Sequence, residues 1–176
     1  MIFGKIRALI VCAVTAGVLA STVVSAAADD AGRAAKPGGR PLLTVLGAIE
    51  KGDGQKVTFD RAAMEAMPVA VVETKTPWTE GVTRFEGVRL TDILARVGAS
   101  GKEVVATAVN DYAVTLPVED ENGAEPVIAY KMNGKPMSLR DKGPLWIVYP
   151  FDSDRNLEAE KYYSRSIWQL KSLTVR

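Results

Sequence analysis

Aromatic side chains and one arginine gather in a few short stretches of this sequence, and together they have the chemistry to bind a small flat ligand. Trp78 stands in a loop between Pro77 and Gly81, and Tyr162 and Arg165 lie near the C-terminus. Aromatic rings attract cations and stack on planar groups, and an arginine guanidinium binds anions through two parallel hydrogen bonds. The sequence therefore predicts a pocket for a small planar or anionic ligand. Packing in the core remains the alternative for each of these rings.

For Trp168 the core is the favoured interpretation. It stands at the head of residues 167–175, an apolar stretch with the composition of a strand. A large aromatic side chain in such a strand is expected to be buried, and we predict that Trp168→Ala costs about 3–5 kcal/mol of stability. An exposed Trp168 would instead favour stacking on a ligand.

A polar turn is the second candidate for chemistry. Asn110, Asp111 and Tyr112 join two expected strands. Asparagine and aspartate favour turns because their side chains bind the neighbouring backbone, so turn formation alone is the favoured interpretation for these two. The hydroxyl of Tyr112 is the group in this turn that we expect a ligand to use.

A third polar stretch, residues 152–156, places side-chain oxygens at alternate positions, as the calcium loop of an EF-hand does. That loop also needs a glycine at its sixth position and a glutamate at its twelfth, where this chain has Leu157 and Tyr163. We therefore interpret the stretch as a solvated loop. The sequence names no metal-binding and no catalytic residue.

The composition excludes several kinds of chemistry. The chain has no histidine, and its one cysteine, Cys12, lies close to the N-terminus. Because Lys5 and Arg7 are the only charged residues before Asp29, the rest of the chain carries 20 basic and 21 acidic residues, a formal charge of −1. This balance excludes a broadly basic surface, so nucleic acid is not an expected partner. Phosphate-binding loops and G-x-S-x-G motifs are also missing from the sequence.

The N-terminus has the three parts of a secretory signal peptide over residues 1–28: a basic head, an apolar middle and a run of alanines that ends at Ala28. Cleavage near Ala28 predicts a periplasmic or secreted protein. A permanent membrane anchor and a lipid anchor at Cys12 are the alternatives. Residues 29–41 have the composition of a disordered leader, and residues 42–176 are long enough for one domain with a sizeable core.

Strands are the main elements expected to position the candidate residues. Apolar and β-branched runs bounded by glycine, proline and Asn-Gly turns predict them. The expected strands are residues 42–49, 57–59, 69–74, 104–109, 112–117, 127–132, 145–149 and 167–175. In the last one the apolar phase shifts between Leu170 and Leu173, which predicts a bulge.

Two short helices complete the expected domain. Asp60 is placed to cap a helix over residues 61–67, which a proline ends. Residues 85–88 lead into a clearer helix over residues 90–97, whose apolar residues recur every three or four positions and which Gly98 ends. Since strands dominate, the predicted class is a β-rich mixed α+β fold.

In their order along the chain, several of these segments resemble the oxidoreductase molybdopterin-binding domain, which has the sulfite oxidase fold. The segments that carry the resemblance are Leu46-Gly47, the helix before Pro68, the Trp78 loop and residues 87–94, 108–112, 128–136 and 143–150. The resemblance covers residues 42–176. It implies a β-rich, barrel-like mixed sheet with a pterin pocket and a molybdopterin cofactor.

The chain departs from the family pattern at the metal. The resemblance implies a molybdenum-binding cysteine on the strand that matches residues 69–76, and no cysteine is there. Asp141 and Lys142 occupy the stretch where the family often has a histidine, and Trp146 stands where it often has an arginine. The resemblance therefore implies this fold without its molybdenum ligand.

The expected export route also indicates a protein without the molybdopterin cofactor. Molybdopterin is loaded in the cytoplasm, so a loaded protein has to cross the membrane folded, through a twin-arginine signal. This N-terminus has Lys5-Ile6-Arg7 in place of paired arginines. Export of the unfolded chain would deliver a protein without the cofactor.

These observations together predict an exported, non-catalytic module that binds or senses a small ligand and holds no cofactor. A membrane-bound sensor or a redox partner is its expected neighbour. The alternative is a periplasmic oxidoreductase that keeps a pterin without the thiolate. The candidate ligand-binding residues are Trp78, Asn110, Asp111, Tyr112, Tyr162 and Arg165. If the resemblance holds, we expect their three segments to converge on one concave surface.

Overall fold

A computed structural model describes residues 39–53 and 55–176 of the chain. The predicted signal peptide and most of the predicted leader fall on residues 1–38, which lie outside the described residues. Within the described part, every helix is too short or too polar to span a membrane.

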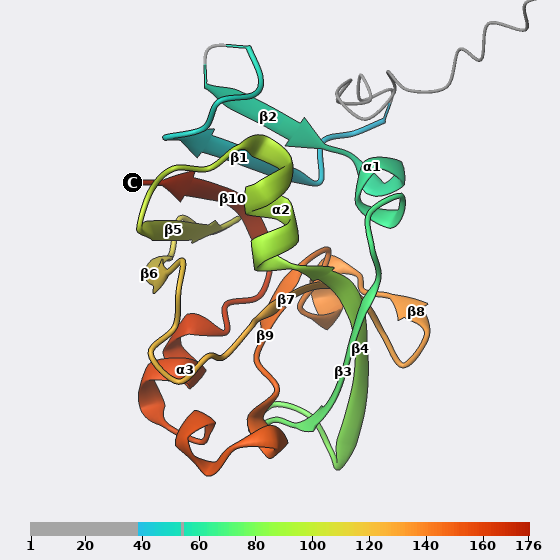
Figure 1. The fold of residues 1–176 in the computed structure, drawn as a ribbon. Helices are drawn as coiled ribbons and strands as arrows, with labels where there is room; N and C mark the ends of the chain where they lie inside the picture. The colour runs from blue at the N-terminus through green and yellow to red at the C-terminus, as the bar shows by residue number, and fades with distance from the viewer. Residues whose placement is uncertain (1–38, 54) are drawn as a thin grey trace, which may run out of the picture. The chain divides into compact units, whose positions relative to one another are not determined.

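One sheet contains the first and the last strand of the described chain. Its order is β2-β1-β10-β5-β6. The strands are β1 (Leu43–Gly47), β2 (Lys56–Phe59), β5 (Glu103–Ala108), β6 (Ala113–Pro117) and β10 (Leu170–Val175). β1 and β10 run parallel, and the other neighbouring pairs of this sheet run antiparallel. The C-terminal strand thus occupies the centre of the sheet (Figure 1).

The second sheet has the order β3-β4-β7-β8, and β9 also pairs with β7. Its strands are β3 (Ala70–Lys75), β4 (Val82–Arg89), β7 (Val127–Met132), β8 (Lys135–Pro136) and β9 (Trp146–Val148). All of these pairs are antiparallel. The predicted Asn-Gly turn at Asn133 and Gly134 joins β7 to β8.

Short helices connect the strands. They are α1 (Arg61–Glu65), α2 (Leu90–Val97) and α3 (Glu160–Arg165), together with the 3-10 helices η1 (Leu139–Asp141), η2 (Phe151–Ser153) and η3 (Arg155–Leu157). Asp60 caps α1 as predicted, because its Oδ1 accepts the N–H of Ala63 at 2.8 Å. Gly98 ends α2 as predicted, in the left-handed conformation that glycine adopts without strain.

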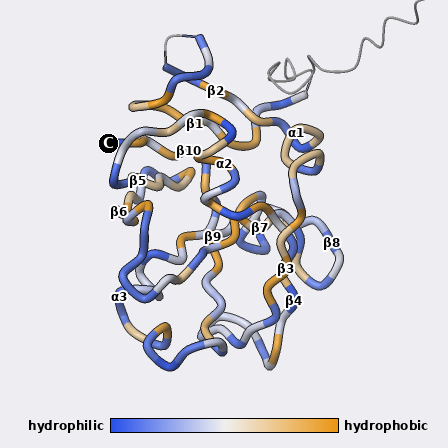
Figure 2. The backbone as a smooth tube through the Cα atoms, viewed as in Figure 1, coloured by the Kyte–Doolittle hydropathy of each residue, from blue (hydrophilic) through white to orange (hydrophobic). Residues whose placement is uncertain are grey.

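The main core lies against the first sheet and α2. Helix α2 buries its whole predicted apolar face there: Leu90, Ile93, Leu94 and Val97. A second, smaller core belongs to the other sheet and includes Trp146. In Figure 2 the hydrophobic stretches follow the strands, whereas the turn that joins β1 to β2 is hydrophilic.

The predicted β-rich mixed α+β class is confirmed. The predicted bulge near Leu170 is also confirmed, since the register of β10 against β5 shifts between Leu170 and Ser172. Residues 85–88 lead into α2 as expected, but they belong to a strand, β4, that the sequence did not predict and that pairs on both sides. Helix α3 was likewise not predicted.

Strand β4 stays paired with β7 through a bulge at a glycine. The register shifts between Glu86 and Gly87. A Cβ atom on Gly87 would lie 2.1 Å from the backbone oxygen of Ile128, closer than any side chain tolerates. Glycine is therefore required where the two backbones approach.

The prediction that Trp168 lies in the core was wrong, because its side chain is 39% exposed. Strand β10 begins only at Leu170, and Trp168 makes a single isolated bridge to Trp146. Gln169, with φ of 54°, breaks the extended backbone between Trp168 and the start of β10 at Leu170. Ile167 and Leu170 fill the core on either side, and the indole of Trp168 is left at the surface.

The role expected for Trp168 in the core belongs to Trp146, which has no exposed surface and whose Nε1–H donates to the carbonyl of Ser166 at 3.1 Å. We expect Trp146→Ala to lower the free energy of unfolding by about 3–5 kcal/mol, the range for a large buried aromatic residue. Trp168→Ala serves as the matched variant and should cost about 1–2 kcal/mol. Chemical denaturation of both variants measures the difference, and equal losses would contradict this assignment.

Candidate functional site

The three segments that the sequence analysis singled out meet at one cavity of about 550 Å³. Its wall is formed by Pro77, Trp78, Ala108, Asn110, Tyr112, Glu160, Tyr163, Ser164, Ile167, Trp168 and Gln169. This volume lies within the range of small-molecule sites, about 300–1000 Å³. The Trp78 loop, the 110–112 turn and helix α3 thus share one concave surface. That a ligand binds there remains a prediction.

Trp78 lies at the centre of the aromatic part of the wall. Its ring centroid is 5.6 Å from that of Trp168 and 6.0 Å from that of Tyr163, with interplanar angles of 72° and 88°. The loop that carries it is braced by Thr76, whose Oγ1 accepts the N–H of Trp78 at 3.1 Å and lies 2.8 Å from Oγ1 of Thr79. The short loop therefore holds the indole in a fixed position.

One face of α3 supplies the polar part of the wall. Glu160, Tyr163 and Ser164 are spaced three and four residues apart, so their side chains lie on the same side of the helix. The ring of Tyr162 points to the opposite side, into the core. The helix therefore separates two neighbouring tyrosines into a cavity residue and a core residue.

The 110–112 turn forms another part of the cavity wall. Oδ1 of Asn110 accepts the N–H of Tyr112 at 3.2 Å, which is the predicted turn chemistry. Tyr112 is 53% exposed and lines the cavity together with Asn110. Asp111 is not part of the cavity wall; its carboxylate pairs with Lys171. The turn thus contributes two of its three candidate residues.

Two further candidates, Tyr162 and Arg165, do not line the cavity, because both are engaged by Asp120. The hydroxyl of buried Tyr162 donates to Oδ1 of Asp120 at 2.7 Å and accepts from the amide of Asn122 at 2.8 Å. Arg165 pairs with Oδ2 of Asp120 at 3.3 Å and lies over the ring of Tyr162. These contacts attach α3 to the loop that follows β6.

The pKa values of three of these groups are shifted, and that of Tyr162 is raised, mainly by burial. Burial by itself raises the pKa of Asp120, but hydrogen bonds from Tyr162, Asn122 and Ala124 and the charge of Arg165 together lower it below its ordinary value of 3.8. Burial raises the pKa of Tyr163, and nearby glutamates, Glu158 and Glu160, raise it further. Asp120 is therefore a stable carboxylate at neutral pH, and Tyr163 keeps its proton.

Strand β3 ends beside the Trp78 loop, and its inward-facing hydroxyls have partners. Oγ1 of Thr74 accepts the N–H of Asp152 at 3.1 Å and donates to the carbonyl of Lys75 at 3.2 Å. The hydroxyl of Thr76 is bonded to Trp78 and Thr79 in the loop brace. Both threonines are buried and serve the local structure.

The 152–156 stretch forms the two 3-10 helices η2 and η3. Oδ2 of Asp152 accepts the N–H of Lys75 at 3.0 Å, and Oδ1 of Asp154 accepts the N–H of Asn156 at 2.8 Å. Across residues 39–53 and 55–176, no three histidine, cysteine, aspartate or glutamate side chains come close enough to share a metal ion. The carboxylates of this loop therefore organise its own backbone.

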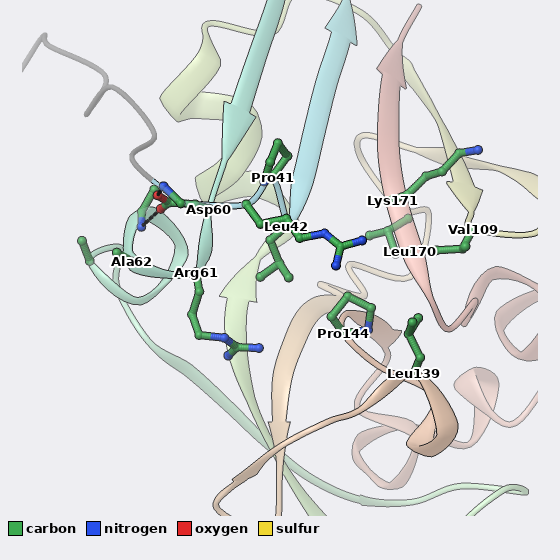
Figure 3. A pocket seen from close by; sticks show the side chains of 14 residues that line it. Pro41, Leu42, Asp60, Arg61, Ala62, Val109, Leu139, Pro144, Leu170 and Lys171 are labelled. Carbon is green, nitrogen blue, oxygen red and sulfur yellow. Dashed lines mark hydrogen bonds between the residues drawn. The ribbon is translucent and has the colours of Figure 1, made fainter.

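A larger cavity of about 1200 Å³ lies between α1 and the start of β10 (Figure 3). Apolar side chains such as Leu42, Leu139 and Pro144 surround it. Its cations include Arg61 and Lys171, which pair with Glu65 and Asp111. It contains none of the candidate ligand-binding residues, so the aromatic cavity is the candidate site.

The fold and this cavity define a strand-rich domain with room for one small ligand. Residues 54–152 match the family model of the oxidoreductase molybdopterin binding domain, and the chain belongs to this family. The resemblance inferred from the sequence motifs is thereby confirmed. A search of curated proteins found no match to the chain.

The residues of this chain do not fit the metal centre that the family resemblance implies. That centre needs a thiolate on the strand that is β3 here. The inward-facing residues of β3 and of its end are Ala70, Val72, Thr74 and Thr76. None carries a thiol, and both hydroxyls are already bonded. None of these inward-facing side chains is free to bind molybdenum.

Several cavity residues escaped the sequence analysis. The sequence patterns single out Tyr163 only at the twelfth position of the calcium-loop comparison, assign Trp168 to the core, and give no role to Glu160, Ser164 or Gln169. The three-and-four spacing of Glu160, Tyr163 and Ser164 was the signal that would have revealed α3 and the face it presents. Trp168 offered no such signal, since its exposure depends on the backbone turn at Gln169.

The contacts of Asp120 predict a pH-dependent contribution to stability. The Asp120 side chain is only 5% exposed. We expect Asp120→Asn to lower the free energy of unfolding at pH 7 by about 1–3 kcal/mol, because it weakens charged hydrogen bonds to Tyr162 and Arg165. A lowered pKa stabilises the fold above the unfolded pKa of about 4, so the difference from the wild type should shrink as the pH falls below about 4.

Urea unfolding between about pH 2.5 and 7 measures this difference. Glu119→Gln, a change of the exposed neighbouring carboxylate, is the control and should alter stability by less than about 0.5 kcal/mol. A difference between wild type and Asp120→Asn that stays constant down to the lowest pH would contradict the assignment.

Proposed function

We propose that this chain is a ligand-binding module of the molybdopterin-binding family that works without molybdenum and holds a small planar ligand in its aromatic cavity. The observation that carries the proposal is the pairing of that cavity with β3, whose inward-facing Thr74 and Thr76 are bonded and carry no thiol. A site without its metal ligand retains the capacity to bind, because stacking and hydrogen bonding need no metal.

The cavity offers both kinds of contact that a flat molecule needs. Trp78, Tyr163 and Trp168 provide aromatic surface. Asn110 and Tyr112 line the same cavity and offer an amide group and a hydroxyl that can orient polar groups of the ligand. In this proposal the aromatic side supplies affinity and these polar groups supply specificity.

The electrostatics favour a neutral or cationic ligand over an anionic one. Arg165, which the sequence suggested as the anion-binding group, is held by Asp120. Among the described residues that line the cavity, Glu160 is the only charged one. A phosphate-bearing cofactor such as molybdopterin would find no cation in this wall, which supports a role other than cofactor binding.

In this proposal the protein is exported, since residues 1–28 have the pattern of a signal peptide. The periplasm or the exterior is then its place of action. A membrane-bound sensor or redox partner would read whether the cavity is filled. This arrangement accounts for a binding domain that has no catalytic residue of its own.

A second candidate function is that of a pterin-dependent oxidoreductase. The family match over residues 54–152 favours it. It requires that the pterin be held without the thiolate and without a cation in the aromatic cavity. Analysis of the native protein distinguishes the two functions.

We expect protein purified from the envelope fraction of its own host to contain no stoichiometric molybdenum and no pterin. The reason is the lack of any thiol beyond Cys12 and the bonded threonines of β3. Elemental analysis measures the metal, and fluorescence after oxidative release measures the pterin. A molybdenum enzyme purified in parallel is the positive control. About one molybdenum atom per chain would overturn the proposal in favour of the oxidoreductase.

A further inference from the structure

The aromatic wall has the geometry of a box rather than of a flat stacking platform. The rings of Tyr163 and Trp168 stand at 88° and 72° to the ring of Trp78, with centroids 6.0 and 5.6 Å from it. A single stacked heterocycle uses parallel faces. Faces nearly at right angles surround a compact group, and the negative faces of aromatic rings attract cations.

The charge of the cavity has the sign that a cation needs. Glu160 is the charged residue of the described wall. Of the nearby cations, Lys161, Arg165 and Lys171 are paired with Glu121, Asp120 and Asp111, and Lys142 lies outside the wall against the ring of Trp168. Glu160 precedes Tyr163 by three residues on α3, so the two side chains are neighbours on one face of the helix. The negative charge thus lies beside the aromatic faces.

The chain itself provides one example of the interaction. Nζ of Lys142, which is not part of the cavity wall, lies 5.1 Å from the centroid of the Trp168 ring. Because Lys142 already contacts the ring of Trp168, a ligand has Trp78 and Tyr163 as its main aromatic contacts, and Tyr112 lines the same cavity. The volume of about 550 Å³ accommodates a small ammonium compound.

We infer that the aromatic cavity binds a small organic cation with a methylated ammonium group, held against Trp78 and Tyr163 with Glu160 as its counter-charge. This inference rests on the proposed binding function and replaces its planar ligand with a compact cation. A quaternary ammonium group, fully substituted as in choline, suits the site because it is weakly hydrated and has no N–H that would need a hydrogen-bond acceptor. A carboxylate on the same ligand would meet Glu160, so choline should bind more tightly than glycine betaine.

The test compares choline with its uncharged isostere 3,3-dimethylbutan-1-ol, using calorimetry and tryptophan fluorescence on the purified protein. We expect choline to bind at least about tenfold more tightly than the isostere, because only the cation interacts with the ring faces. Glu160→Gln should weaken choline binding about fivefold and leave the isostere unaffected. Glu103→Gln removes the same charge from an exposed strand position outside the cavity and should change neither affinity.

Tyr163→Leu should weaken choline binding by more than about tenfold, and its thermal unfolding shows whether the fold is kept. Equal binding of choline and the isostere, or an unchanged choline affinity in Glu160→Gln, would overturn the inference, as would the absence of choline binding. Pterin-6-carboxylate is the planar anionic probe. If it binds in a Tyr163-dependent manner and choline does not, the cation inference fails while the proposed binding function stands. Molybdenum in the native protein would overturn the proposed function independently of these titrations.

Discussion

The burial of Trp146 is the interaction on which most of this structure depends. Its indole is fully enclosed, meets Phe85 and Trp78 edge to face, and donates a hydrogen bond to the carbonyl of Ser166. Through this residue β9 of the second sheet is joined to the segment that leads into β10 of the first sheet. An unpaired indole N–H in a core would be costly, so this hydrogen bond fixes the position of the backbone at Ser166. Trp78 and Trp168, which form part of the cavity wall, both pack against the ring of Trp146.

A second constraint, centred on Asp120, determines which residues of α3 are available to a ligand. The carboxylate engages Tyr162 and Arg165, so the arginine that looked like an anion-binding group stabilises the fold instead. The same contacts orient α3 so that Glu160 and Tyr163 face the cavity. The ion pair between Arg165 and Asp120 thus determines the charge of the cavity wall. One buried carboxylate leaves the cavity without a cation and with a single acidic residue in its described wall.

Membership of the molybdopterin-binding family and the loss of its metal ligand are compatible in physical terms. A fold depends on its core and sheet register, and these persist when a single polar position changes. In this chain Thr74 has the partners that a structural residue needs, since it bonds to Asp152 and Lys75 and thereby connects β3 to η2. Thr74 thus has a stabilising role on the strand where the family resemblance implies a metal ligand. A binding function for the neighbouring aromatic cavity is consistent with this change.

The sequence by itself determined the β-rich class, the amphipathic helix α2, the cap at Asp60, the bulge near Leu170 and the family, because these depend on local periodicity and on the order of short motifs. It also predicted that the segments of Trp78 and Tyr112 meet, and both residues line one cavity. Only the tertiary structure decided the roles of Trp146 and Trp168, since an apolar stretch does not reveal where its backbone turns. Likewise, Arg165 is kept out of the cavity wall by its ion pair with Asp120, which is 45 residues away in the sequence. Long-range pairing of charges is set by packing, and no local pattern encodes it.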